Sequence, residues 1–150
     1  MVSTEAPPQW QTETPKKSGI DYLVALQYPN VIVYDILNWH EDPDGTCNWS
    51  PFYSKAAHII GHIRLADCLR YLTGYETPVE HYTPIAGKLH WNFNEPISKE
   101  VQLAVIPGSY DLIEWDEDGW SYNIEHCFGH IPLKAFLQAV EKELPFNFES

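Results

Sequence analysis

The chain has 150 residues and a formal net charge of -12 at pH 7, with 9 basic and 21 acidic residues. Nucleic-acid binding depends on Lys and Arg side chains that neutralise phosphates, so this balance argues against direct contact with DNA or RNA and with an anionic membrane surface. The length suits one hydrophobic core, and a composition with 44% hydrophobic and 14% aromatic residues excludes a chain that is disordered throughout.

The N-terminal residues 1–18 contain three prolines and mostly polar side chains, which predicts a flexible tail because such a segment buries too little to offset its ordering entropy. The remainder, residues 19–150, is expected to form a single globular domain. Two apolar runs, residues 20–28 and 31–37, are separated by the turn pair Pro29-Asn30. They predict two neighbouring strands.

A long helix is predicted from about residue 51 to residue 73, because Ser50-Pro51 is typical of a helix start and Gly74 of a helix end. Its apolar residues fall on two sides, which indicates a helix placed between the sheet and another element or a second subunit. Alternating apolar residues predict a strand over 88–93. Branched residues predict another over 101–106.

Residues 110–128 predict a β-hairpin, because aromatic and branched runs flank a polar turn that ends in Gly119. A stripe of apolar residues predicts the last helix over about 132–144, and Pro145 ends it. The order of these elements predicts an α+β fold with a mostly antiparallel sheet of about five to seven strands and two packed helices.

Three cysteines, Cys47, Cys68 and Cys127, are widely spaced and odd in number, which favours reduced thiols over a disulfide framework. No apolar run approaches the ~18 residues that a membrane span needs. The N-terminus also lacks the pattern of a signal peptide. We therefore expect a soluble, cytoplasmic protein.

Acidic residues are concentrated in two segments without Lys or Arg, residues 18–54 with five carboxylates and residues 101–131 with six. If the two predicted hairpins adjoin, their loops form one negative surface beside several tryptophans. In protein interfaces aromatic side chains supply affinity, and charge steers a partner of opposite sign. The expected partner-binding residues are Glu41, Asp42, Asp44, Trp49, Glu114, Trp115, Asp116, Glu117, Asp118 and Trp120. The simpler alternative is that acidic loops only keep the domain soluble and that the tryptophans belong to the core.

The leading interpretation of this pattern is a non-enzymatic acidic module that recognises a basic surface of a protein partner. It would act as an inhibitor, an immunity-type protein or a phosphate-mimicking accessory protein, since carboxylates can occupy a site made for phosphates. The module would be a monomer or a homodimer. A small-ligand binder with an aromatic pocket is an alternative interpretation.

A metal-dependent hydrolase is a further alternative, because residues 42–46 read Asp-Pro-Asp-Gly-Thr. This stretch resembles the DxDGT nucleophile motif of haloacid-dehalogenase-like phosphatases. The resemblance implies that Asp42 attacks phosphorus, that Asp44 acts as acid and base, and that magnesium is the cofactor. It covers five residues only. The family places the motif directly after a buried strand of a parallel sheet, and neither the preceding His40-Glu41 nor the rest of the chain follows that pattern.

Four histidines suggest a second route to a metal site. His58 and His62 lie four residues apart on the expected helix, and His126 and His130 repeat this spacing after the hairpin. Together they could hold zinc. The simpler interpretation is that His58 and His62 face solvent and that the protein has no cofactor. Cys127 is read as a small buried hydrophobic residue.

Overall fold

The structure is a computed structural model that describes residues 6–50, 57–79, 81, 85–96, 99–116, 119–120 and 127–146. The contacts divide the chain into two compact units. Unit 1 comprises Met1–Cys68 and Phe146–Ser150, and unit 2 comprises Leu69–Pro145. The single domain expected over 19–150 stays a prediction.

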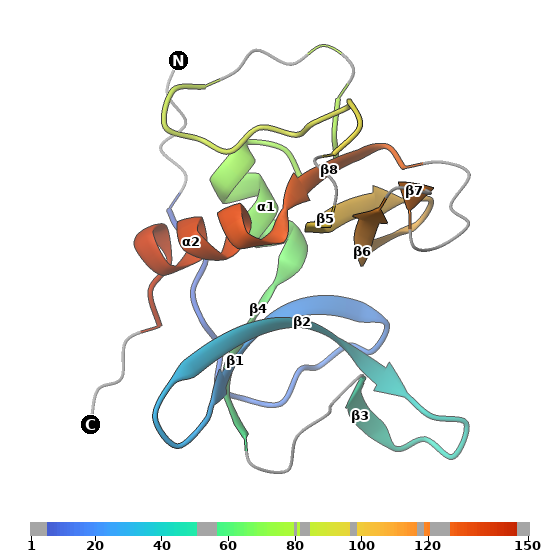
Figure 1. The fold of residues 1–150 in the computed structure, drawn as a ribbon. Helices are drawn as coiled ribbons and strands as arrows, with labels where there is room; N and C mark the ends of the chain where they lie inside the picture. Colours follow the sequence, from blue (N-terminus) through green and yellow to red (C-terminus); the bar gives the residue numbers. More distant parts are fainter. Residues whose placement is uncertain are drawn as a thin grey trace. The chain divides into compact units, whose positions relative to one another are not determined.

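Unit 1 is built on an antiparallel sheet with the strand order β3-β2-β1-β4 (Figure 1). The strands are β1 (Ile20–Gln27), β2 (Ile32–Glu41), β3 (Cys47–Ser50) and β4 (His58–Arg64). β1 lies between β2 and β4, and its residues Leu23, Val24 and Ala25 are completely buried. Because successive side chains of a strand point to opposite faces, both faces of β1 are covered. This confirms the two predicted N-terminal strands, although β2 continues four residues beyond its predicted end.

The N-terminal segment is attached to the outer edge of β4. Gln11 and His62 exchange two backbone hydrogen bonds, each of 2.8 Å. The Trp10 ring lies 5.7 Å from the Tyr34 ring and 5.4 Å from the Phe146 ring, measured between centroids. Residues 10 and 11 therefore have defined partners in unit 1.

The predicted helix over 51–73 is wrong in its central part. Residues 58–64 form β4, and the helix α1 comprises only Leu65–Thr73. The two-sided apolar pattern has a simple explanation, because Ile59, Ile60 and Ile63 belong to a strand while Leu65, Leu69 and Leu72 follow the helical spacing i, i+4, i+7. β-branched isoleucines favour strands. The predicted start at Pro51 lies outside the described residues.

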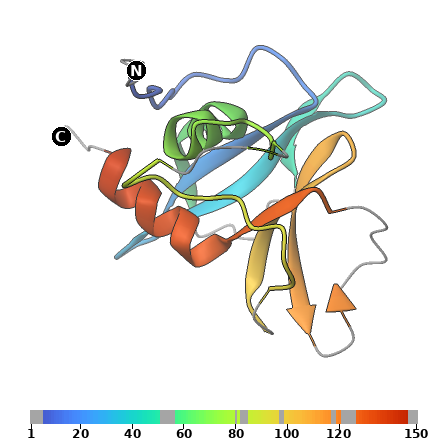
Figure 2. The ribbon, with the colours of Figure 1, turned by 90° about the horizontal axis from the view of Figure 1, so that it is seen from above.

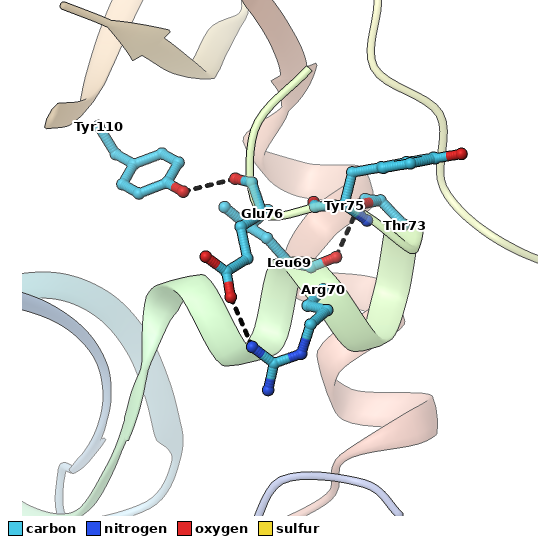
Figure 3. Close-up of polar contacts among 6 residues, drawn as sticks. All are labelled: Leu69, Arg70, Thr73, Tyr75, Glu76 and Tyr110. Carbon is cyan, nitrogen blue, oxygen red and sulfur yellow. Dashed lines mark hydrogen bonds and ion pairs between the residues drawn. The ribbon is translucent and has the colours of Figure 1, made fainter. Parts of the chain in front are cut away.

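The end of α1 is fixed by local hydrogen bonds (Figure 3). Gly74 has a φ of +91°, a conformation that glycine adopts readily, and its amide donates to the carbonyl of Arg70. The Thr73 hydroxyl lies 2.6 Å from the carbonyl oxygen of Leu69. Beyond the helix, Glu76 accepts from Arg70 at 2.5 Å through its carboxylate and from the Tyr110 hydroxyl at 2.5 Å through its carbonyl. These contacts tie the segment after α1 to β6 (Ser109–Asp116).

Unit 2 contains a second antiparallel sheet, with the strand order β7-β6-β5-β8. Besides β6, its strands are β5 (Val101–Ile106), the two-residue β7 (Gly119–Trp120) and β8 (Gly129–Pro132). The helix α2 (Leu133–Glu143) follows β8 directly and packs on β5 and β8 (Figure 2). Its buried residues are Phe136 and Val140. The predicted last helix, the strand over 101–106 and the β6–β7 pairing are confirmed.

The α+β class is therefore confirmed, with the strands distributed over two antiparallel sheets where the sequence was read as one. The expected strand over 88–93 is present only as an isolated bridge between Asn92 and His130. Among the described residues, no helix combines the length and the apolar character that a membrane span requires.

Candidate functional site

The acidic residues of unit 1 lie at the tip of the β2–β3 hairpin. The Asp42 carbonyl accepts from the Gly45 amide at 2.9 Å, and Gly45 has a φ of +88°. These features define a β-turn over residues 42–45 that ends in a glycine of left-handed conformation. Asp44 Oδ1 accepts from the Thr46 amide at 2.9 Å, and this hydrogen bond lowers the pKa of Asp44. Asp42 Oδ2 accepts from Asn48 Nδ2 at 2.9 Å. Both carboxylates thus stabilise the turn while carrying its negative charge.

An aromatic cluster lies at the base of this hairpin. Trp39 and Trp49 are paired across β2 and β3, with their rings 4.9 Å apart in an edge-to-face arrangement. Trp49 also contacts the Tyr22 ring at 5.6 Å and the His62 ring at 5.6 Å. Trp39 and Trp49 are each half-buried. They therefore contribute to the core of unit 1 while part of each indole remains accessible two residues from the acidic tip.

The acidic and aromatic residues of unit 2 do not form one face. Glu114 and Trp115 are successive residues of β6, so their side chains point to opposite faces of the sheet. Trp115 pairs with Trp120 through the backbone, and Asp116 pairs with Gly119. The predicted Glu117 and Asp118 lie outside the described residues.

The expected composite surface joined the loops of two hairpins. The β2–β3 turn with Glu41, Asp42 and Asp44 belongs to unit 1, whereas Glu114, Trp115 and Asp116 belong to unit 2. Their convergence on one surface stays a prediction. What the structure brings together is Trp39, Trp49 and the acidic tip within a single hairpin.

The Asp42–Thr46 turn connects two antiparallel strands. A nucleophile of the resembled phosphatase family would follow a strand of a parallel sheet. Here the Asp42 and Asp44 carboxylates accept hydrogen bonds from within the same hairpin, from Asn48 and Thr46. The geometry of this stretch therefore supports its role as a hairpin turn.

The four histidines proposed as metal ligands have different surroundings. His58 and His62 lie on β4 and not on a helix, His58 being exposed and His62 buried. His62 Nε2 contacts the carbonyl oxygen of Glu13. His126 lies outside the described residues. No group of three or more potential metal ligands is present in the part of the chain that the structure describes.

A buried polar pair in unit 2 was missed by the sequence analysis. His130 Nδ1 lies 3.1 Å from Gln102 Oε1, and His130 Nε2 lies 2.5 Å from the carbonyl oxygen of Asn94. A neutral imidazole has one donor and one acceptor, so Nε2–H donates to Asn94 and Nδ1 requires a donor. The side-chain NH2 group of Gln102 can be this donor. The hydrogen-bond network therefore assigns the Gln102 amide the orientation in which its nitrogen, and not its oxygen, faces Nδ1. The sequence did contain one indication of this pair, because Gln102 is a polar residue inside the apolar run Val101–Ile106.

The pH dependence of stability should reflect His130. Burial lowers the pKa of His130, so the unfolded chain, with an ordinary histidine pKa of about 6.5, binds this proton more readily than the native protein. The contribution of neutral His130 to the free energy of unfolding is therefore fully present above about pH 6.5. It is lost as the pH falls below that value. We expect the free energy of unfolding to decrease between about pH 7 and pH 5, by at most ~1.4 kcal/mol per pH unit from this proton.

Urea unfolding at a series of pH values measures this dependence. His130→Gln should flatten it, whereas His58→Gln, at an exposed position of β4, should leave it as in the native sequence. Equal slopes for the native protein and His130→Gln would contradict the prediction.

A groove in unit 2 lies along α2. It has a volume of about 560 Å³ and is lined by Glu100, Val101, Pro132, Leu133, Lys134, Leu137, Gln138 and Glu141. This volume lies within the range of about 300–1,000 Å³ that small-molecule sites occupy. Its lining is aliphatic and polar, whereas the sequence led us to expect an aromatic pocket.

Comparison of the chain with protein-family models, with curated proteins and with solved structures finds no match in any of the three.

Proposed function

We propose that this protein is a non-enzymatic binding module that recognises a basic surface of a protein partner through the β2–β3 hairpin. One observation carries the proposal. The half-buried side chains of Trp39 and Trp49, whose ring centroids are 4.9 Å apart, belong to the same hairpin as the carboxylates of the tip. Aromatic residues are enriched at the energetic centres of protein interfaces, and opposite charge accelerates and orients association.

The charge of the surrounding sequence supports this proposal. Residues 18–54 contain five carboxylates and no Lys or Arg. Hydrogen bonds within the turn hold the Asp42 and Asp44 carboxylates in place before any partner arrives. A preorganised acidic surface loses less conformational entropy on binding than a mobile one. An inhibitor, an immunity-type protein or a phosphate-mimicking accessory protein would all use such a surface in the cytoplasm.

Charge reversal at the hairpin tests the proposal. Glu41→Lys should slow association with the partner about 10-fold or more at low salt, because steering depends on the sign of the surface charge. The difference should shrink in about 1 M salt, where the screening length falls to about 3 Å. Affinity purification from the source cells identifies the partner, and surface plasmon resonance with the purified partner measures the association rate.

The matched control is Glu143→Lys, which makes the same change of charge at an exposed position in the last turn of α2. It should leave the association rate within about two-fold of the native value, since Glu143 lies outside the hairpin to which the proposal assigns the contact. Equal effects of the two substitutions would show that net charge alone acts, and the hairpin would lose its assigned role.

Small-ligand binding is the second candidate function, and the groove of about 560 Å³ along α2 favours it. Its aliphatic residues Val101, Leu133 and Leu137 would contact an apolar ligand.

A further inference from the structure

Unit 2 contains a small cavity that the hairpin proposal does not use. Its volume is about 150 Å³. It is lined by Asn92, Phe93, Asn94, Glu95, Pro96, Trp115, Cys127, Gly129 and His130. These residues come from the segment before β5, from the end of β6 and from the start of β8.

Backbone hydrogen bonds hold the walls of this cavity in place. Asn92 and His130 exchange two of them, at 2.9 and 3.0 Å, which fixes the segment 92–96 against β8. Trp115 is also held by its backbone: its carbonyl accepts from the Lys99 amide at 2.5 Å, and its amide donates to the carbonyl of Glu100 at 3.4 Å. These backbone contacts connect the residues of the wall to neighbouring strands, as in most ligand sites, which are largely pre-formed.

The lining has the electrostatic character of a site for a cation. Glu95 is the one acidic residue among the nine lining residues, and none of them is Lys or Arg. Burial lowers the pKa of His130, so the imidazole is neutral at pH 7. Trp115 and Phe93 add aromatic rings, and Phe93 is 52% exposed. An aromatic ring and a carboxylate together attract a positive group through the ring quadrupole and the ionic charge.

The volume limits the size of the positive group. A cavity of about 150 Å³ accommodates a molecule such as benzene, with about six non-hydrogen atoms. The lysine side chain has about five non-hydrogen atoms beyond Cα and ends in a compact ammonium, whereas arginine ends in a wider, planar guanidinium. The small volume of the cavity therefore favours lysine. We propose that this cavity receives a lysine side chain. The inference rests on the proposed function in that the lysine would belong to the same basic partner.

The test uses the full-length protein and needs no partner. An acetylated and amidated Gly-Gly-Lys-Gly-Gly peptide is titrated into isotope-labelled protein, and the NMR shifts of the Trp115 indole and the Gly129 amide are followed. The control peptide replaces Lys by norleucine, which keeps the carbon chain and removes the charge. The lysine peptide should bind at least about 5-fold more tightly, the effect of a charge-assisted contact and a cation–π contact at a partly exposed site.

Two substitutions localise the effect. Glu95→Gln and Trp115→Leu should each weaken lysine-peptide binding about 2- to 5-fold and leave norleucine-peptide binding unchanged. Glu114→Gln, on the opposite face of β6, is the matched control and should change neither. If Trp115→Leu does not fold, Glu95→Gln alone is compared with the native protein, because this substitution changes the charge of the side chain and not its volume.

Equal binding of the two peptides, or the absence of shifts at Trp115 and Gly129, would overturn the lysine assignment. A third peptide carries Arg in place of Lys, and its binding more tightly than the lysine peptide would overturn the choice of lysine over arginine. None of these results depends on Glu41, so failure of the cavity and failure of the hairpin proposal are separate outcomes.

Discussion

Phe136→Ala should lower the free energy of unfolding by about 3–5 kcal/mol, the cost of removing a large aromatic side chain from a packed core. Phe136 is completely buried on the face of α2 that packs on β5 and β8. A domain of this size has a total stability of about 5–15 kcal/mol, so the substitution removes a large fraction of it. Chemical denaturation followed by tryptophan fluorescence and far-ultraviolet circular dichroism measures the loss.

The control for this prediction is Gln138→Ala, two residues further along α2 and exposed. It should change the free energy of unfolding by less than about 0.5 kcal/mol, as most surface substitutions do. If Phe136→Ala lowers the free energy of unfolding by less than about 1 kcal/mol, the packing of the Phe136 ring does not stabilise α2 against the core.

Gly129→Ala should destabilise the protein by about 1–3 kcal/mol, because overpacking a closed site forces neighbouring atoms to shift. The added Cβ would lie 2.5 Å from Cγ and 3.0 Å from Cβ of Pro78. The proline ring cannot rotate away as a flexible side chain could. Gly129 begins β8, so the shift would also disturb the pairing of β8 with β5.

A double-mutant cycle separates this clash from other effects of alanine. Pro78→Ala removes the atom at 2.5 Å, so the double variant should be more stable than the sum of the two single effects predicts, by about 0.5 kcal/mol or more. Additive effects would show that the contact with Pro78 is not the cause of the loss. The native protein, the two single variants and the double variant are measured by urea denaturation at one pH.

The sequence predicted those elements whose signal is local. The spacing of Phe136, Leu137 and Val140 describes one face of a helix, and α2 is found there. The turn pair Pro29-Asn30 similarly separates β1 from β2. The failure at 51–73 arose because a strand and a helix are adjacent without a turn between them, so their apolar residues were read as two sides of one helix.

The candidate site was predictable only in part. The acidic turn at residues 42–44 was identified from residue types, because Pro, Asp and Gly favour turns for known reasons. The contact between Trp39 and Trp49 depends on the register of β2 and β3, which the turn type determines and composition does not reveal. The pairing of Gln102 with His130 joins residues 28 positions apart. A single sequence contains no signal for such a distant partner beyond the polar residue itself.

The attachment of Gln11 to β4 has a consequence for the behaviour of the protein at high concentration. β4 ends its sheet, and the strand that ends a sheet offers unused amides and carbonyls to any other chain. Gln11 occupies the amide and carbonyl of His62, near the middle of that row. The segment that was expected to be a flexible tail therefore covers part of the sheet edge through which two molecules could otherwise pair.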